Sequence, residues 1–400
     1  MRHFQLIGHT FFIKQSHLIF YVIRWLIICT LIGALAGSAS ALFLIALNWA
    51  TEWREAHLWI IALLPVGGFL IGLSYYLWDQ SVEKGNNLLI EEFHSPKKVI
   101  PLKMAPIVLI TTVATHFFGG SAGREGTAVQ IGGSIADQFT KWFKLKTRDR
   151  KILIIVGISA GFASVFGTPL AGAIFALEVL IIGRIRYEAI FPSFLVAYLA
   201  NYFCELWPVN HTHYSIPIIP EVNFSNLVWA ILAGMAFGLA GRLFSKMIHF
   251  FSRHFKNKIS YPPLRPVIGG IIIALVVWLM GSTRYIGLGL PVIIEAFHQP
   301  VPIYDFLLKT LFTTFTLAAG FKGGEVTPLF FIGATLGNML FWIIPLPMAL
   351  LAGMGFVAVF AAATNTPLAC ILMGIELFGI EGGIFIAIAC IVSYLFSGHS

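Results

Sequence analysis

The sequence is poor in charged residues. Only 11% of its 400 residues are charged, 58% are hydrophobic, and the mean hydropathy is +0.85. Soluble domains carry about 25% charged residues, so this composition excludes a soluble globular protein and predicts an integral membrane protein. The apolar segments have helical lengths and lack the short alternation of a membrane barrel. We therefore expect an all-α membrane protein.

Paired cysteines and enzyme signatures are also missing. No CxxC pair, HExxH, Walker or dinucleotide fingerprint occurs, so we expect neither a metal nor a cofactor. The cysteines, expected to be buried thiols, are Cys29, Cys204, Cys370 and Cys390. Residues 119–123 fit the G-x-S-x-G hydrolase pattern around Ser121. In a chain with 38 glycines such a match arises easily by chance, and this one lacks the strand-turn-helix context of a hydrolase. We expect a transporter rather than an enzyme.

The basic residues gather in two clusters, at 141–151 and 252–258, between apolar segments. The positive-inside rule predicts that both are cytoplasmic loops. The net charge of +8 therefore requires no nucleic-acid partner. Residues 1–18 lack a signal-peptide cleavage site, which predicts a retained cytoplasmic segment or helix before the first membrane segment.

The chain contains an internal repeat. GSAGREGT at 120–127 matches GFKGGEVT at 320–327, and two further blocks recur in the same order at nearly the same offset. Self-similarity of this kind marks homologous structural units. We expect two membrane repeats, 19–205 and 225–398, joined by a polar linker at 206–224.

Both repeats mix long and short apolar segments. The long segments are 19–50, 59–78, 103–118, 151–166, 189–204, 225–250, 266–281, 305–320 and 346–363. The short segments are 86–94, 126–138, 168–180, 289–297, 327–337 and 366–377. The short segments cannot cross a hydrocarbon core of about 30 Å. Short, glycine-interrupted helices at matching places in two repeats predict a transport site near the membrane midplane.

Three helix starts, at residues 85–87, 126–127 and 326–327, have the chemistry of an anion site. A helix N-terminus presents unpaired N–H groups and the positive end of its dipole, and glycine permits close approach. The residues expected to contact the anion are Asn86, Gly126, Thr127, Val326 and Thr327. Asn86 and the two threonines also have side chains that donate hydrogen bonds.

Two glutamates lie beside these starts. Ionised Glu125 would compete with an anion for the site, and protonated Glu125 would leave it, which couples anion movement to proton movement. The alternative is that Glu125 pairs with Arg124 or caps its own helix. Glu325 is expected to be a second proton-accepting group. The alternative there is a structural pair with Lys322.

For the other polar residues we expect structural or solvent-facing roles. Glu178 and Glu376 follow equivalent blocks, and we expect both to satisfy backbone N–H groups or an interface. Glu91, Glu92 and Glu295 end short segments and are expected to reach water. His116 is expected to face a pore or an interface.

The motifs resemble those of the CLC family of chloride channels and anion/proton antiporters. GSAGREGTAVQIGG (120–133) is similar to its G-K/R-E-G-P motif, GFASVFGTPLAGAIFALE (161–178) to the next block, and GGEVTPLFFIGATLG (323–337) to a later one. GNNLLIEEF (85–93) falls where the family has its first anion-filter motif. The resemblance implies a homodimer with one pore per subunit, two inverted repeats with many broken and re-entrant helices, and Glu125 as the gating glutamate.

Departures from the usual motifs indicate which branch of the family the chain resembles. Thr127 replaces the usual Pro, Asn86 the filter Ser, and Val179 the Glu that carries cytoplasmic protons in chloride/proton antiporters. Glu325 stands where chloride transporters lack a carboxylate. This combination resembles the fluoride/proton antiporter branch, which protects microbes from fluoride. With Val179 unable to carry a proton, Glu325 is expected to be the relay.

The resemblance therefore implies a multi-pass fluoride/proton antiporter in the bacterial cell membrane. Its expected partners are fluoride, protons, lipid and a second copy of the chain. The alternatives are a chloride or nitrate antiporter of the same family and a passive anion channel. The family pore also uses a Tyr from the C-terminal helix. Tyr394 comes too early to match it, so either that Tyr follows in a longer protein or this pore lacks it.

Overall fold

The computed structural model describes residues 2–78, 82–180, 185–212 and 214–398, with side chains described from residue 19 onward. Within these ranges the chain is helical, without a β-strand, and has one isolated β-bridge. This agrees with the all-α membrane fold expected from the composition.

The described helices occur in two runs. The first run is α1 (Arg2–Ala56), η1 (Leu58–Leu63), α2 (Leu64–Trp78), η2 (Val82–Lys84), α3 (Asn86–His94), α4 (Met104–Phe118), α5 (Glu125–Trp142), α6 (Thr147–Phe166), α7 (Pro169–Glu178), η3 (Tyr187–Ala189) and α8 (Ile190–Glu205). The second run is α9 (Phe224–Lys258), α10 (Leu264–Met280), α11 (Leu290–His298), α12 (Asp305–Ala318), α13 (Val326–Leu340), α14 (Met348–Thr364), α15 (Pro367–Phe378) and α16 (Gly383–Ser397).

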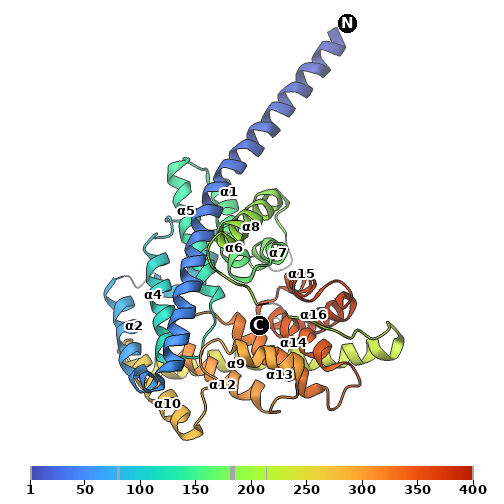
Figure 1. The fold of residues 1–400 in the computed structure, drawn as a ribbon. Helices are drawn as coiled ribbons and strands as arrows, with labels where there is room; N and C mark the ends of the chain where they lie inside the picture. Colours follow the sequence, from blue (N-terminus) through green and yellow to red (C-terminus); the bar gives the residue numbers. More distant parts are fainter. Residues whose placement is uncertain (1, 79–81, 181–184, 213, 399–400) are drawn as a thin grey trace.

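Helix lengths follow the predicted mixture of long and short segments. In the described chain, three helical stretches are long and apolar enough to cross a membrane, and they are Ile19–Ala56, Leu58–Trp78 and Phe224–Lys258. Most other apolar helices have 10–17 residues. The first part of α1 extends away from the helical bundle (Figure 1).

Several predicted boundaries needed correction. α3 begins and ends at the predicted residues, but α5 continues to Trp142 and α13 to Leu340, past the predicted ends at 138 and 337. The buried side chain of Phe139 belongs to the extension of α5, so packing lengthens that helix. α16 was absent from the predicted segments, although Gly383 and Gly398 delimit a clear apolar run.

Corresponding helices of the two runs make corresponding contacts. α5 packs on α6 as α13 packs on α14, and α1 packs on α8 as α9 packs on α16. The first run, blue to green, lies beside the second, yellow to red, with α2 against α10 (Figure 1). The arrangement follows the order of the repeated sequence blocks.

Two glutamates tie the runs to each other. Glu178, the last residue of α7, accepts hydrogen bonds from two backbone N–H groups at the start of α15, at 3.2 and 2.9 Å. Glu376 of α15 accepts from two N–H groups at the start of α7, at 2.9 and 2.8 Å. Each carboxylate therefore caps the other's helix, which confirms the predicted architectural role.

Glycines allow the helix pairs to approach closely. A Cβ atom at Gly157 of α6 would lie 2.6 Å from the carbonyl oxygen of Gly132 on α5. Gly355 of α14 faces Gly333 of α13 in the same way. Small residues at such crossings let helix backbones pack in a membrane, where water does not drive association.

The linker at 206–224 is packed more tightly than its polar sequence suggests. Its described residues up to Asn223 form no helix. Ile216 is buried, and the ring of Tyr214 packs against Phe297 and Phe356 with centroids 5.3 and 5.2 Å apart. The linker thus anchors itself in the second run.

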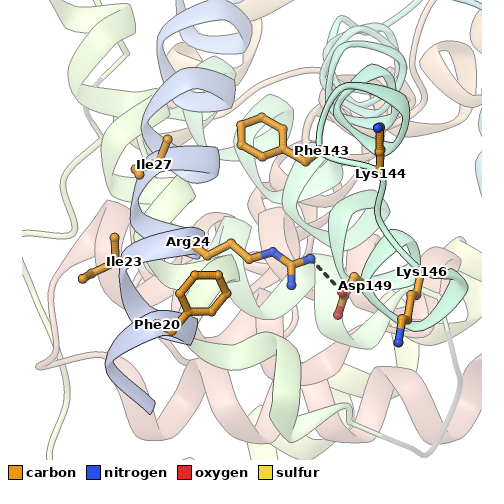
Figure 2. A pocket seen from close by; sticks show the side chains of 8 residues that line it. All are labelled: Phe20, Ile23, Arg24, Ile27, Phe143, Lys144, Lys146 and Asp149. Atoms are coloured by element: carbon orange, nitrogen blue, oxygen red, sulfur yellow. Dashed lines mark hydrogen bonds and ion pairs between the residues drawn. The ribbon is translucent and has the colours of Figure 1, made fainter. Parts of the chain in front are cut away.

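Ion pairs fasten the ends of the first-run helices. Arg150 of α6 binds Asp137 of α5 at 2.7 Å and Glu92 of α3 at 3.1 Å. Glu92 is therefore buried, which corrects the expectation that it reaches water. Nearby, Arg24 of α1 reaches Asp149 at 2.7 Å across a groove of about 560 Å³ (Figure 2).

Candidate functional site

The loops before α5 and α13 meet in the middle of the molecule. Gly123 and Gly324 exchange two backbone hydrogen bonds, at 2.6 and 2.7 Å, as an antiparallel bridge. The two residues come from corresponding repeat blocks, although the repeat equivalent of Gly123 is Gly323, one position before Gly324. The bridge places the beginnings of both helices side by side.

A cavity of about 710 Å³ lies against these helix starts. Residues of both runs line it. The predicted site residues among its lining are Asn86, Glu125, Gly126, Glu325 and Val326. Ser245, His249 and Ser252 of α9 line it as well. Ser252 opens the basic cluster at 252–258, which the positive-inside rule predicts to be cytoplasmic and which forms the end of α9 instead of the predicted loop.

Glu125 is completely buried and is held by the start of α13. Its Oε2 accepts hydrogen bonds from the backbone N–H of Thr327 at 3.1 Å and from that of Arg124 at 3.0 Å. Its Oε1 accepts a hydrogen bond from the hydroxyl of Thr327. The carboxylate therefore sits where an anion would bind at the N-terminus of α13.

Arg124 lies beside this carboxylate without binding it closely. Its Nε is 3.7 Å from Glu125 Oε1, and that buried nitrogen has no hydrogen-bond partner among the described residues. The Arg124 side chain is therefore a weaker partner of the Glu125 carboxylate than the start of α13 is. The α13 N-terminus and Thr327 hold the carboxylate more directly.

Glu325 has a different environment, although it is the repeat equivalent of Glu125. Its side chain is exposed to the cavity, and its carboxylate forms no hydrogen bond or ion pair with any described residue. The alternative of a structural pair with Lys322 is therefore not realised. Glu325 is a carboxylate on the wall of a cavity shared with Glu125.

Asn86 lies at the start of α3, next to the start of α5. A Cβ atom at Gly126 would be 3.2 Å from Asn86 Nδ2, so the amide group approaches the α5 backbone closely. Gly85, at φ 57°, uses a conformation that favours glycine and directs the chain into α3. Gln130, whose Nε2 lies 3.3 Å from a Cβ built at Gly85, also lines the cavity and was not predicted.

Thr127 and Thr327 do not behave alike. The Thr127 hydroxyl is 2.7 Å from that of Thr112 on α4, and Thr127 is not among the residues lining the cavity. Thr327 is bound to Glu125 instead. The structure thus brings Thr327, but not the Thr127 hydroxyl, to the carboxylate.

Several other expected positions are now placed. Val179 lines the cavity beside the cap formed by Glu178. His116 is completely buried and is not among the residues that line the cavity, which corrects the expectation that it faces the pore. The hydroxyl of Ser121 lies 2.9 Å from that of Thr313. All four cysteines are buried, as predicted.

Sequence reasoning did not place Lys322. Its Nζ lies 4.2 Å from the centre of the Tyr75 ring, and both residues line the cavity. Tyr75 lies outside the repeated sequence blocks, so no motif linked it to Lys322. In the described part of the chain, no group of three or more His, Cys, Asp or Glu side chains could hold a metal ion.

Comparisons with known proteins agree with this architecture. The family model described as "Voltage gated chloride channel" matches residues 67–398. A chloride/fluoride channel protein of Pseudomonas syringae pv. tomato is 54% identical, over 97% of this chain and 87% of its own length. An H+/Cl− exchange transporter of Vibrio campbellii is 26% identical, over 88% of this chain and 81% of its own.

Solved structures have the same fold. The crystal structure of a CLC-type fluoride/proton antiporter superposes with a TM-score of 0.91 at 35% identity, covering 94% of this chain and 95% of that one. A slow cyanobacterial Cl−/H+ antiporter gives 0.81 at 22% identity, covering 94% of each chain, which supports the fold alone. The helix order, the paired glycine loops and these matches together show that the chain belongs to the voltage-gated chloride channel (CLC) family of membrane proteins.

Proposed function

We propose that this protein is a secondary-active fluoride/proton antiporter that exports fluoride. The observation that carries the proposal is the position of the Glu125 carboxylate, which occupies the N-terminus of α13 as an anion would. The relatives add support, because one is named a chloride/fluoride channel protein and another a fluoride/proton antiporter.

Exchange follows from competition for one position. Ionised Glu125 fills the site and excludes fluoride, whereas protonated Glu125 loses its charge and with it most of the attraction of the helix dipole. Fluoride then enters as the protonated side chain leaves. One proton is therefore bound each time the site opens to the anion, which links the two movements.

Glu325 is proposed as the second proton carrier. It faces the cavity that also contains Glu125, and it has no partner among the described residues to hold its proton or its charge. Val179 has no proton to give, so the carboxylate on the opposite repeat is the available group. Protons would pass between the cavity and Glu125 by way of Glu325.

The proposed anion ligands surround the same helix starts. The Asn86 amide and the backbone of Gly126 lie together at the start of α5, while Val326 and Thr327 begin α13. Thr127 would contribute its backbone N–H, because its hydroxyl is engaged by Thr112. Close, strong donors suit fluoride, since removing water from a small anion is costly.

The remaining parts of the proposal concern the assembly. We propose two inverted repeats, 19–205 and 225–398, preceded by a cytoplasmic segment at 1–18; the reciprocal caps of Glu178 and Glu376 support this division. We further propose that the protein is a homodimer in the bacterial cell membrane, with one pore in each subunit.

Fluoride and proton flux from proteoliposomes tests the proposal. Wild-type protein should move fluoride against protons, and Glu125→Gln should abolish the proton-coupled movement because an amide cannot exchange the proton. The control is Glu221→Gln, an exposed linker residue, which should leave flux unchanged.

Other outcomes identify other functions. Proton-coupled fluoride flux that survives Glu125→Gln would refute the mechanism. Faster chloride or nitrate than fluoride exchange would make the protein a chloride or nitrate antiporter. A reversal potential that ignores the proton gradient would make it a passive anion channel.

A further inference from the structure

We propose that Lys322 and Tyr75 form a second anion-binding site within the cavity, which takes up fluoride on the cytoplasmic side before it reaches Asn86 and Glu125. The inference deepens the proposed function and rests on it. Its starting point is the Lys322 ammonium group, which lies in the cavity without a hydrogen-bond acceptor among the described residues.

Tyr75 and α4 fix the position of Lys322. The Lys322 ammonium lies 4.2 Å from the Tyr75 ring centre, in the geometry of a cation–π contact. The Tyr75 hydroxyl is 3.3 Å from Thr111 Oγ1, and the Lys322 backbone N–H donates to Thr115 Oγ1 at 3.2 Å. Thr111 and Thr115 are one turn apart on α4, so one helix holds both members of the pair.

The ammonium has no acceptor among the described residues. No hydrogen bond or ion pair of Lys322 Nζ is formed within 2–78, 82–180, 185–212 and 214–398, and no interaction of Lys322 is left unaccounted for. The ring face covers one side of the ammonium, and the lysine is only half-buried, so its remaining N–H groups are open to the cavity.

The charged groups around the cavity favour an anion at this point. Its carboxylates are Glu83, Glu125 and Glu325, and its basic side chains are Lys84, His249 and Lys322. Lys84 forms an ion pair with Glu91 at 2.6 Å. Lys322 is thus the unengaged ammonium that shares a cavity with the proposed anion ligands.

The chemical class of ligand is a small, hard anion. A single ammonium can replace part of the hydration shell of fluoride before the backbone groups at α3 and α5 replace the rest, which divides one costly dehydration into two smaller steps. Because the cavity reaches Ser252, at the start of the basic cluster, the proposed order is cytoplasm, Lys322, Asn86 and then the Glu125 position.

The test measures fluoride efflux from proteoliposomes as a function of the fluoride concentration inside them. Lys322→Gln should raise the fluoride concentration for half-maximal flux about tenfold, the loss of one charge-assisted contact, with the maximal rate within about twofold. Lys322→Arg keeps the charge and should restore most of the affinity. The matched control, Lys84→Gln, removes a cavity lysine that is already paired and should change neither value.

Tyr75 gives a second, independent variant pair. Tyr75→Leu removes the ring face and should weaken fluoride uptake severalfold, whereas Tyr75→Phe keeps the ring face and should retain more of the fluoride affinity than Tyr75→Leu does. Calorimetric titration of the purified variants with sodium fluoride should reproduce the same order of affinities. This pair retains the test if Lys322→Gln fails to yield a monodisperse protein.

An unchanged half-maximal fluoride concentration in Lys322→Gln would overturn the site. A changed proton-to-fluoride ratio with unaltered fluoride affinity would also overturn it and would assign Lys322 to the electrostatics of Glu325. Both results leave the proposed function standing if Glu125→Gln still abolishes coupling. Survival of coupling in Glu125→Gln would instead refute the function itself.

Discussion

Glu125 and Glu325 occupy equivalent positions of the repeat and have opposite environments. Glu125 is fully buried on the backbone and hydroxyl of Thr327, whereas Glu325 faces the cavity without a partner in the described chain. An ionised carboxylate at a helix N-terminus is stabilised by the N–H groups and the dipole. The repeated motif therefore produces one carboxylate held at the N-terminus of α13 and another that faces the cavity, where it would exchange protons under the proposed mechanism.

Replacement of Glu325 should separate proton movement from anion movement. Glu325→Gln keeps the shape and polarity of the side chain but cannot accept a proton. We expect proton-coupled fluoride flux to fall at least about tenfold while the protein keeps its fold, because the Glu325 carboxylate binds no other described residue. Simultaneous fluoride-electrode and pH recordings on proteoliposomes measure both ions.

The matched control for Glu325→Gln is Glu381→Gln, at an exposed position just before α16. It removes the same charge outside the cavity and should leave the ratio of protons to fluoride unchanged. Full coupling in Glu325→Gln would show that the proton reaches Glu125 by another route.

The sequence predicted the identities of the site residues better than their contacts. Asn86, Glu125 and Glu325 all line the predicted cavity. Which threonine would meet Glu125 was not predictable, because Thr127 and Thr327 stand at equivalent motif positions and differ only in their neighbours. Thr112 takes the first hydroxyl and Glu125 the second. Such contacts depend on packing between segments some 200 residues apart, which a motif does not encode.

At the scale of helices, starts were easier to predict than ends. α7 and α15 begin at a proline that follows a threonine, and proline favours the first position of a helix. α5 was predicted to end too early, since the buried Phe139 extends it through contacts that local sequence does not reveal. Glu92 was misjudged for the same reason, because its partner Arg150 arrives from a different helix.

The crossing of α5 and α6 should tolerate no added carbon atom. A Cβ at Gly157 would lie 2.6 Å from the Gly132 carbonyl oxygen and 2.7 Å from Gly133 Cα, and both are backbone atoms that cannot move aside cheaply. Gly157→Ala should therefore destabilise the protein by about 1–3 kcal/mol. The drop appears as a lower thermal unfolding midpoint of the detergent-solubilised protein.

Gly383→Ala is the matched control for this helix crossing. Its added Cβ would lie 3.6 Å from the nearest atom, in ordinary contact, at the first position of α16. It should be neutral or slightly stabilising, since alanine favours a helix more than glycine does. Equal unfolding midpoints for the two variants would contradict the close packing of α5 on α6.

Burial should decide how much each ion pair of α6 contributes to the stability of the protein. Arg150 is buried between Asp137 and Glu92, so Arg150→Gln leaves two carboxylates without their cation and should cost about 3 kcal/mol. Arg24 and Asp149, at the groove in Figure 2, have side chains 31% and 26% exposed. Arg24→Gln should cost less than about 1 kcal/mol. Thermal unfolding of the two variants would contradict this ranking if Arg24→Gln proved the more harmful.

At the scale of the whole molecule, the repeats are joined by symmetric contacts around an asymmetric site. The two carboxylate caps pair equivalent places of α1–α8 and α9–α16, and the Gly123–Gly324 bridge joins the corresponding loops with an offset of one residue. The internal repeat predicted that the halves would correspond, but it did not predict where they would touch. The linker was equally hard to predict, because its polar composition gave no sign that Tyr214 and Ile216 pack against the second run.

The cap formed by Glu178 offers a test of how the whole molecule moves its protons. Its two oxygens are occupied by backbone N–H groups of α15, so its charge holds the repeats together. Glu178→Gln can accept only one of these bonds and presents an amide to the other. It should cost about 1–2 kcal/mol of stability, and Glu376→Gln should cost a similar amount because it mirrors the same cap.

Proton coupling should survive in Glu178→Gln, since the proposed proton route runs through Glu325 and the cavity. Thermal unfolding and coupled flux measured on the same preparation separate the two effects. Loss of coupling in a variant of normal stability would move the proton route to α7, beside Val179. Loss of stability with intact coupling would assign Glu178 to the joint between the repeats and leave Glu325 as the carboxylate by which this fold exchanges protons.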